Sequence, residues 1–235
     1  MSLEENIRRV RENIALAARE VGRDPGEIAL CAATKTQSDK TIRAAIAAGI
    51  TLCGENRVQE MTAHLDADAY AGAELHYNGH LQTNKEKQVV GRVDLIQSVD
   101  SERLLRAIDR QAAALDLRQD ILLEVNIGGE ESKSGVAPEE VEALSRLACQ
   151  LSHVRLRGLM AIPPIVSEKG NREFFHKMYE IYVDIIRKMS HNENDINCLS
   201  MGMSGDYMDA VREGATLVRV GTALFGERPP LAPGI

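Results

Sequence analysis

Short apolar runs alternate with amphipathic stretches along almost the whole chain, and this alternation limits the folds that the sequence can adopt. Most neighbouring runs are separated by segments whose apolar residues recur at helical spacing. Repeated strand-then-helix units give parallel strands joined by crossover helices. Eight units favour an α/β fold, a closed (β/α)8 barrel of the TIM type. The predicted strands are Ile28–Ala33, Thr51–Cys53, Leu75–Tyr77, Leu95–Val99, Ile121–Asn126, Val154–Met160, Ile196–Ser200 and Leu217–Val220.

An additional N-terminal helix precedes the first strand. Ser2 and Glu5 form a capping box, and apolar residues from Ile7 to Val21 follow at helical spacing. An open doubly wound sheet is the alternative fold, but no GxGxxG motif follows the first strand, so its main dinucleotide-binding signature is missing. No linker, low-complexity tract or internal repeat interrupts the pattern. We therefore expect a single domain over residues 1–235.

Charge and cysteine content exclude several classes of function. A net charge of −7 argues against non-specific binding to nucleic acid or membranes, although it leaves room for a local anion site. No apolar run approaches membrane-spanning length, and we expect no signal peptide because the N-terminal residues are acidic and lack an apolar core. Four cysteines without a CxxC pair favour a reducing, cytoplasmic location. His76 and His80 have the spacing of helical metal ligands, but the intervening Asn78-Gly79 disfavours a helix, so no metal site is expected.

Lys35 and two small-residue loops are the strongest chemical features. Lys35 directly follows the first predicted strand, at the end where barrel active sites are built, and phosphates in such barrels bind after strands seven and eight. There the chain has 201–205, Met-Gly-Met-Ser-Gly, and Gly221-Thr222, whose backbone N–H groups and hydroxyls favour an anion. A lysine able to form a Schiff base and a phosphate site suggest pyridoxal 5′-phosphate (PLP). The plainer alternatives are a solvated lysine and ordinary glycine turns.

Arg219 is a charged residue inside the last apolar strand. It alternates with Val218 and Val220, so it points to the opposite face of that strand. In a closed barrel the last strand adjoins the first, and a cation near Lys35 would lower the pKa of the lysine. Arg219 could form an ion pair, or it could face the pyridine nitrogen of PLP. An arginine there leaves that nitrogen neutral, which makes PLP a weak electron sink.

Seven motifs together resemble those of the pyridoxal phosphate homeostasis proteins, which are PLP-binding barrels related to the N-terminal domain of alanine racemase. Each motif alone is weak, but the ordered set is specific and covers nearly the whole chain. The resemblance implies a (β/α)8 barrel with an N-terminal helix. The motifs are AATKT around Lys35, GENRVQE at 54–60, GHLQTNK at 79–85, NIGGEESKSGV at 126–136, GLMAIPP at 158–164, LSMGMSGDY at 199–207 and VRVGTALFGE at 218–227.

The resemblance also implies the residues of a PLP site. Two positions depart from the pattern of many relatives: Arg57 replaces an aromatic residue and Asn78 an aliphatic one, which would alter the rim of the site and what docks there. The implied set is Lys35 as the Schiff-base lysine, Arg219 at the pyridine nitrogen, Asn56 near the ring hydroxyl, and Ser204, Gly221, Thr222 and the backbone of Met203 at the phosphate.

Three functions follow as hypotheses. The first is a protein of intracellular PLP homeostasis, monomeric and without robust turnover, which holds PLP and hands it to apo-enzymes. The second is a PLP-dependent amino-acid racemase or lyase. Racemase chemistry needs a second base, which in alanine racemase is a tyrosine of an appended domain. We expect no room for such a domain after the eighth unit, so His80 or Tyr207 would have to act as the second base. The third is a barrel enzyme for another phosphorylated metabolite.

Overall fold

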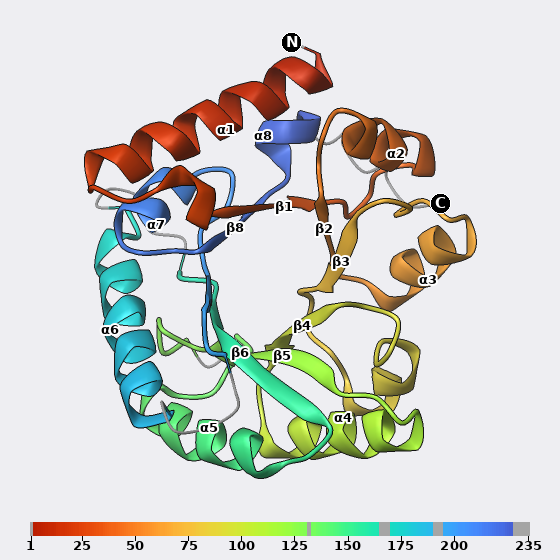
Figure 1. Ribbon diagram of the computed structural model, residues 1–235, viewed down its shortest axis with the longest axis vertical. Coiled ribbons are helices and arrows are strands. Elements are labelled where there is room, and N and C mark those ends of the chain that lie inside the picture. The colour runs from red at the N-terminus through yellow and green to blue at the C-terminus, as the bar shows by residue number, and fades with distance from the viewer. Residues whose placement is uncertain (1, 131–132, 165–169, 190–194, 228–235) are drawn as a thin grey trace.

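Eight parallel strands close into a barrel in which each strand pairs with its neighbours in the chain and the last returns to the first (Figure 1). The structure is a computed structural model and describes residues 2–130, 133–164, 170–189 and 195–227. It confirms the predicted barrel, and the strands begin and end within three residues of the predicted bounds. They are β1 Ala29–Ala33, β2 Leu52–Glu55, β3 Glu74–Tyr77, β4 Leu95–Val99, β5 Gln119–Val125, β6 Val154–Ala161, β7 Cys198–Ser200 and β8 Leu217–Val220.

Helices surround the barrel on its outer side (Figure 1). The connection between β3 and β4 holds a 3-10 helix and no α-helix; its polar sequence TNKEKQ lacks the apolar stripe that an α-helix would bury against the barrel. The helices are α1 Leu3–Glu20, η1 Pro25–Glu27, α2 Asp39–Ala47, α3 Val58–Asp66, η2 Thr83–Gln88, α4 Glu102–Ala114, η3 Pro138–Glu140, α5 Val141–Gln150, α6 Arg172–Met189, α7 Tyr207–Arg212 and α8 Thr222–Phe225.

The N-terminal helix α1 is present and begins as the sequence predicts. Ser2 Oγ accepts a hydrogen bond from the Glu5 N–H at 3.2 Å, and the Glu5 carboxylate accepts one from the Ser2 N–H at 2.8 Å. The buried stripe of α1 packs against α7 and α8. The Asn6 side chain donates to the backbone carbonyl of Leu224 in α8 at 2.9 Å. This helix therefore braces the two elements that follow β7 and β8.

Helix α3 begins without a side-chain cap. It starts after Arg57, whose side chain makes no capping hydrogen bond, although Glu55 and Asn56 stand just before it in the sequence. Glu55 is unavailable because it is fully buried and its carboxylate accepts from the Asn56 N–H at 2.9 Å and from the hydroxyl of Tyr70 at 3.3 Å. The end of β2 is thereby fixed by a buried polar network.

The barrel interior is only partly apolar. The main core lies between strands and helices, whereas two small clusters inside the barrel are built from β1, β2 and β8 and from β4, β5 and β6. They consist of Cys31, Leu52 and Leu217, and of Leu95, Leu122 and Met160. The buried polar side chains of the strands include His76, Gln97, Glu124, Ser200 and Arg219. Such groups are stable in a core only when they are hydrogen-bonded.

The described part of the chain contains no helix that is both long and apolar enough to cross a membrane.

Candidate functional site

A pocket of about 350 Å³ opens at the end of the barrel where the strands terminate. Its volume is sufficient for a small ligand. Four of the seven predicted cofactor residues line it together. The lining is Ala33, Lys35, Gly54, Asn56, Asn78, Gly79, His80, Glu124, Val125, Lys133, Ser134, Ile162, Met203 and Arg219.

The backbone around Lys35 is held on both sides. Thr34 donates its N–H and its hydroxyl to the carbonyl of Gly54 in β2, at 2.9 and 3.1 Å. Thr36 donates its N–H to the Glu60 carboxylate at 2.9 Å and has φ +66°, a left-handed conformation that is strained for a β-branched residue. The half-buried Lys35 therefore leaves β1 from a fixed position.

Arg219 lies deep in the same pocket. It is 4% exposed, and its N–H groups donate to the Ser200 hydroxyl and, at 3.0 Å, to the carbonyl of Ala161. Burial lowers the pKa of the Arg219 guanidinium, but an arginine stays charged in proteins. The strand pairing places Arg219 opposite Cys31 in β1, four residues before Lys35. A permanent cation thus lies beside the middle of the strand that precedes Lys35.

The loops that follow β7 and β8 are linked by hydrogen bonds. Ser204 Oγ accepts the N–H groups of Gly221 and Ala223, both at 3.1 Å. Thr222 is exposed at the first residue of α8. The backbone N–H of Met203 donates to the Asp206 carboxylate of its own loop at 2.7 Å. The structure therefore links Ser204 to Gly221, which Thr222 follows in the chain, whereas the N–H of Met203 is engaged within its own loop.

The buried side-chain oxygen of Asn56 indicates whether a ligand fits here, and two neighbouring glycines show how closely the backbone packs around it. The side-chain oxygen of Asn56 is buried without a hydrogen-bond partner among the described residues, which is costly unless a ligand supplies one. A Cβ on Gly54 would lie 2.6 Å from the Cys31 sulfur, and one on Gly79 would lie 2.0 Å from the Asn56 carbonyl oxygen. The lysine amine, the cation, the unpartnered amide and the hydroxyl-bearing loop match the chemical groups of PLP.

Glu124 is a pocket residue that the sequence reasoning missed. It lies in β5 and is 7% exposed. Burial, reinforced by the charge of Asp100, raises the pKa of Glu124 to about 7, although Arg219 opposes the shift. The signal was available, because Glu124 alternates with apolar residues inside a predicted strand in the same way as Arg219.

The two candidates for a second base are separated. His80 lines the pocket, and its Nδ1 lies 3.0 Å from the Ser134 hydroxyl and 3.2 Å from an Asp100 carboxylate oxygen. Tyr207 is buried against α1, where its hydroxyl accepts a hydrogen bond from Asn13 at 2.9 Å. Only His80 is therefore placed to act in the pocket.

The two departures from the family pattern also differ in position. Asn78 lines the pocket, whereas Arg57 is exposed and pairs with Glu60 at 2.8 Å. Glu60 in turn accepts the N–H of Thr36, the residue after Lys35, so Arg57 is linked to this loop through Glu60.

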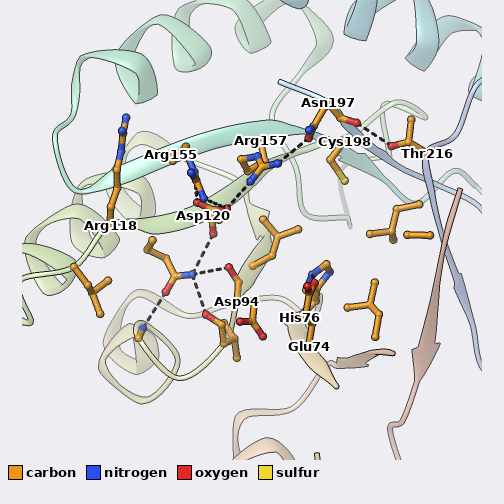
Figure 2. A pocket seen from close by; sticks show the side chains of 18 of the residues that line it. Glu74, His76, Asp94, Arg118, Asp120, Arg155, Arg157, Asn197, Cys198 and Thr216 are labelled. Atoms are coloured by element: carbon orange, nitrogen blue, oxygen red, sulfur yellow. Dashed lines mark hydrogen bonds and ion pairs between the residues drawn. The ribbon is translucent and has the colours of Figure 1, made fainter. Parts of the chain in front are cut away.

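A second and larger pocket, of about 700 Å³, lies at the opposite end of the barrel, where the strands begin (Figure 2). In this floor pocket Asp120 pairs with Arg155 at 2.6 Å and with Arg157 at 2.9 Å. None of the predicted cofactor residues lines it. Among the described residues no group of three or more His, Cys, Asp or Glu side chains could hold a metal ion.

Glu124 should give the unliganded protein a distinctive pH dependence. The pKa of Glu124 is about 7 in the folded protein and 4.5 ordinarily, so between these two pH values the folded state binds more protons than the unfolded state. The free energy of unfolding therefore falls as the pH rises through this interval, by roughly 3 kcal/mol in total. Urea unfolding at pH 5 and pH 8 should show a loss in the wild type that is about 2–3 kcal/mol larger than in Glu124→Gln. Glu139→Gln, which removes an exposed carboxyl, should behave as wild type. Equal losses in wild type and Glu124→Gln would contradict the assignment.

Comparison with known proteins identifies the family. Residues 6–229 match the model of the alanine racemase N-terminal domain. The chain is 40% identical to the pyridoxal phosphate homeostasis protein of Aquifex aeolicus, over 95% of this chain and 97% of that one. It is 38% identical to the protein of that name from Pseudomonas aeruginosa, over 99% and 98% of the two chains.

Solved structures agree with the sequence relatives. PipY of Synechococcus elongatus, solved with PLP bound, has a TM-score of 0.83 and 32% identity, and the match covers 96% of this chain and all of that one. Alanine racemase from Corynebacterium glutamicum has a TM-score of 0.68 at 15% identity, over 96% of this chain and 62% of that one, which shows a shared fold. The chain therefore belongs to the alanine racemase N-terminal domain family and, within it, to the pyridoxal phosphate homeostasis proteins.

Proposed function

We propose that this protein binds PLP through a Schiff base at Lys35 and acts in PLP homeostasis in the cytoplasm, as a monomeric single domain that delivers PLP to apo-enzymes. The observation that carries the proposal is one pocket shared by Lys35 and Arg219 beside the Ser204–Gly221 link. Relatives named for this role and a PLP-bound neighbour support it. The cysteines are all free, which suits a reducing compartment.

Each predicted residue has a role that its chemistry supports. Lys35 would hold the aldehyde carbon, Asn56 would lie near the ring hydroxyl, and Ser204, Gly221 and Thr222 would hold the phosphate with help from the backbone of Met203. Arg219 would face the pyridine nitrogen and keep it unprotonated, because a permanent cation disfavours a second positive charge beside it. Bound PLP supplies an electron sink, and it is a weak one when its nitrogen is neutral.

Lys35 should be the only lysine that links to PLP. After borohydride reduction, peptide mass spectrometry should find the phosphopyridoxyl group on Lys35, and the visible absorption band of the loaded protein should be absent in Lys35→Ala and Lys35→Arg. The arginine variant keeps the charge but cannot form the bond. Lys133 lines the same pocket and pairs with Glu130, so Lys133→Arg is the matched control. A phosphopyridoxyl group on Lys133 in the wild type would move the site.

Ser204→Ala combined with Thr222→Val should weaken PLP binding but not pyridoxal binding. Each hydrogen bond lost to a charged phosphate costs about 1.5–3 kcal/mol, and pyridoxal has no phosphate to lose. Equilibrium titration of both aldehydes into wild type and variant measures the difference. An equal loss of affinity for the two ligands would show that these hydroxyls do not bind the phosphate.

A PLP-dependent amino-acid racemase or lyase is the second candidate, and the pocket itself gives the observation in its favour. Glu124, whose pKa burial raises to about 7, lines the pocket beside Lys35 together with the imidazole of His80, and carboxyl and imidazole groups are common general acids and bases. Against it stands Arg219, since a weak electron sink does not stabilise a carbanion at the α-carbon.

Proton exchange at the α-carbon separates the two functions. We expect that the loaded protein, incubated with L- or D-alanine, serine or threonine in heavy water, incorporates no deuterium at enzymatic rates of roughly 1–1,000 per second. Nuclear magnetic resonance of the amino acids follows the exchange. Rapid incorporation that disappears in Lys35→Ala would establish a racemase or lyase instead.

A further inference from the structure

A chain of hydrogen bonds crosses the barrel interior from the cofactor pocket to the floor pocket. Arg219 in β8 contacts the Ser200 hydroxyl in β7, which contacts the Gln97 side-chain oxygen in β4 at 2.6 Å. The Gln97 side-chain nitrogen lies 2.9 Å from Nδ1 of His76 in β3. All four side chains are at most 5% exposed. Four strands thus contribute one continuous polar column.

Arginine fixes the direction of every bond in this column. A guanidinium only donates, so Ser200 Oγ must accept from Arg219 and give its own proton to the Gln97 oxygen. The Gln97 amide nitrogen is then the donor to His76, and Nδ1 of His76 must accept. The column therefore requires neutral His76 with its proton on Nε2.

The environment of His76 agrees with this requirement. His76 lines the floor pocket, and its Nε2 lies 3.9 Å from the carboxylate of Glu74 in the same strand (Figure 2). Asp94, just before β4, and Asp120 in β5 favour a charged imidazole, but burial outweighs them and lowers the pKa of His76 to about 4. The imidazole is neutral at physiological pH and can accept.

Reversing the column would disturb Arg219. If Nδ1 of His76 carried a proton, the Gln97 amide would have to turn and present its nitrogen to Ser200. Ser200 Oγ would then face two donors, and its own proton would lose the acceptor that Gln97 now provides. The two ends of the barrel are consequently coupled through the orientation of one buried amide.

We propose that Ser200, Gln97 and His76 are positioning residues that orient Arg219 and couple PLP binding to the floor pocket. The inference rests on the proposed function, because it takes Arg219 as a PLP contact. Coupling between two sites is reciprocal, so the floor pocket must also sense PLP. Two independent measurements follow, one at each end of the column.

The test at the cofactor end compares two substitutions of His76. His76→Asn keeps an acceptor that cannot be charged, whereas His76→Leu keeps more of the volume and has no acceptor. The Kd for PLP and the visible absorption band of the loaded protein are measured for both and for Gln97→Leu. We expect His76→Leu and Gln97→Leu to bind PLP about tenfold more weakly with a shifted band, and His76→Asn to match wild type.

Gln119→Leu is the matched control. Gln119 is buried in the floor pocket and hydrogen-bonded to the backbone of Gly91 and Val93, away from the column. It should lose stability without changing the Kd or the absorption band. A purely structural role for His76 predicts the opposite order, with the smaller asparagine binding PLP more weakly than leucine. That order, or a Gln97→Leu variant with wild-type Kd and band, would overturn the proposal.

The test at the floor end uses the unliganded protein. Nitrogen-15 chemical shifts should show His76 neutral with the proton on Nε2, and they should move on addition of PLP to wild type but not to Gln97→Leu. A proton on Nδ1 would overturn the proposal. A wild type that gives no visible band with PLP would refute the proposed function instead, and the tautomer in the unliganded protein would still decide how the column is oriented.

Discussion

The buried positive charge of Arg219 is the constraint on which the rest of the site depends. A guanidinium removed from water must find acceptors, and a protein interior offers few. Here the acceptors are the Ser200 hydroxyl and the Ala161 carbonyl, with the Glu124 carboxyl as a nearby charge partner. The apolar clusters of the barrel are accordingly small, with three buried residues each, and buried polar side chains such as Gln97 and Ser200 come from the same set of strands.

Barrel closure turns this constraint into a site. Pairing of β8 with β1 brings the strand that carries Arg219 against the strand that ends before Lys35. Pairing of β7 with β8 brings Ser204 to the N–H groups of Gly221 and Ala223. Lys35 and Arg219 are far apart in the chain, yet these strand pairings place both in the lining of one pocket.

Much of this arrangement was predictable from the sequence, because it follows from the spacing of apolar residues and from the position of each site residue relative to the end of a strand. The alternation of strand and helix gave eight strands, and Lys35, Ser204 and Gly221 could be assigned to one end because each follows a strand. Arg219 was visible as a charge within an apolar run. Glu124 is likewise a charged residue within an apolar run. It was missed because a single carboxylate on the inner face of a strand does not by itself indicate one particular function.

Side-chain partnerships could not be predicted. Ser200, Gln97 and His76 lie on three different strands, and their contact depends on barrel stagger and on the rotamers of buried side chains. The partners of Glu55 could not be predicted for the same reason, since its carboxylate is engaged by Thr34, Tyr70 and the Asn56 N–H. Local sequence specifies where a residue lies along its helix or strand, but not which distant group will be the hydrogen-bond partner of its side chain.

Ser204 has a consequence for the direction in which its own proton can point. Its hydroxyl oxygen accepts the N–H groups of Gly221 and Ala223 at the start of α8. A hydroxyl oxygen that accepts two hydrogen bonds keeps its own proton for an acceptor on the other side. An anion that takes this proton leaves the two internal hydrogen bonds in place, so the link between the two loops does not have to break when a ligand binds.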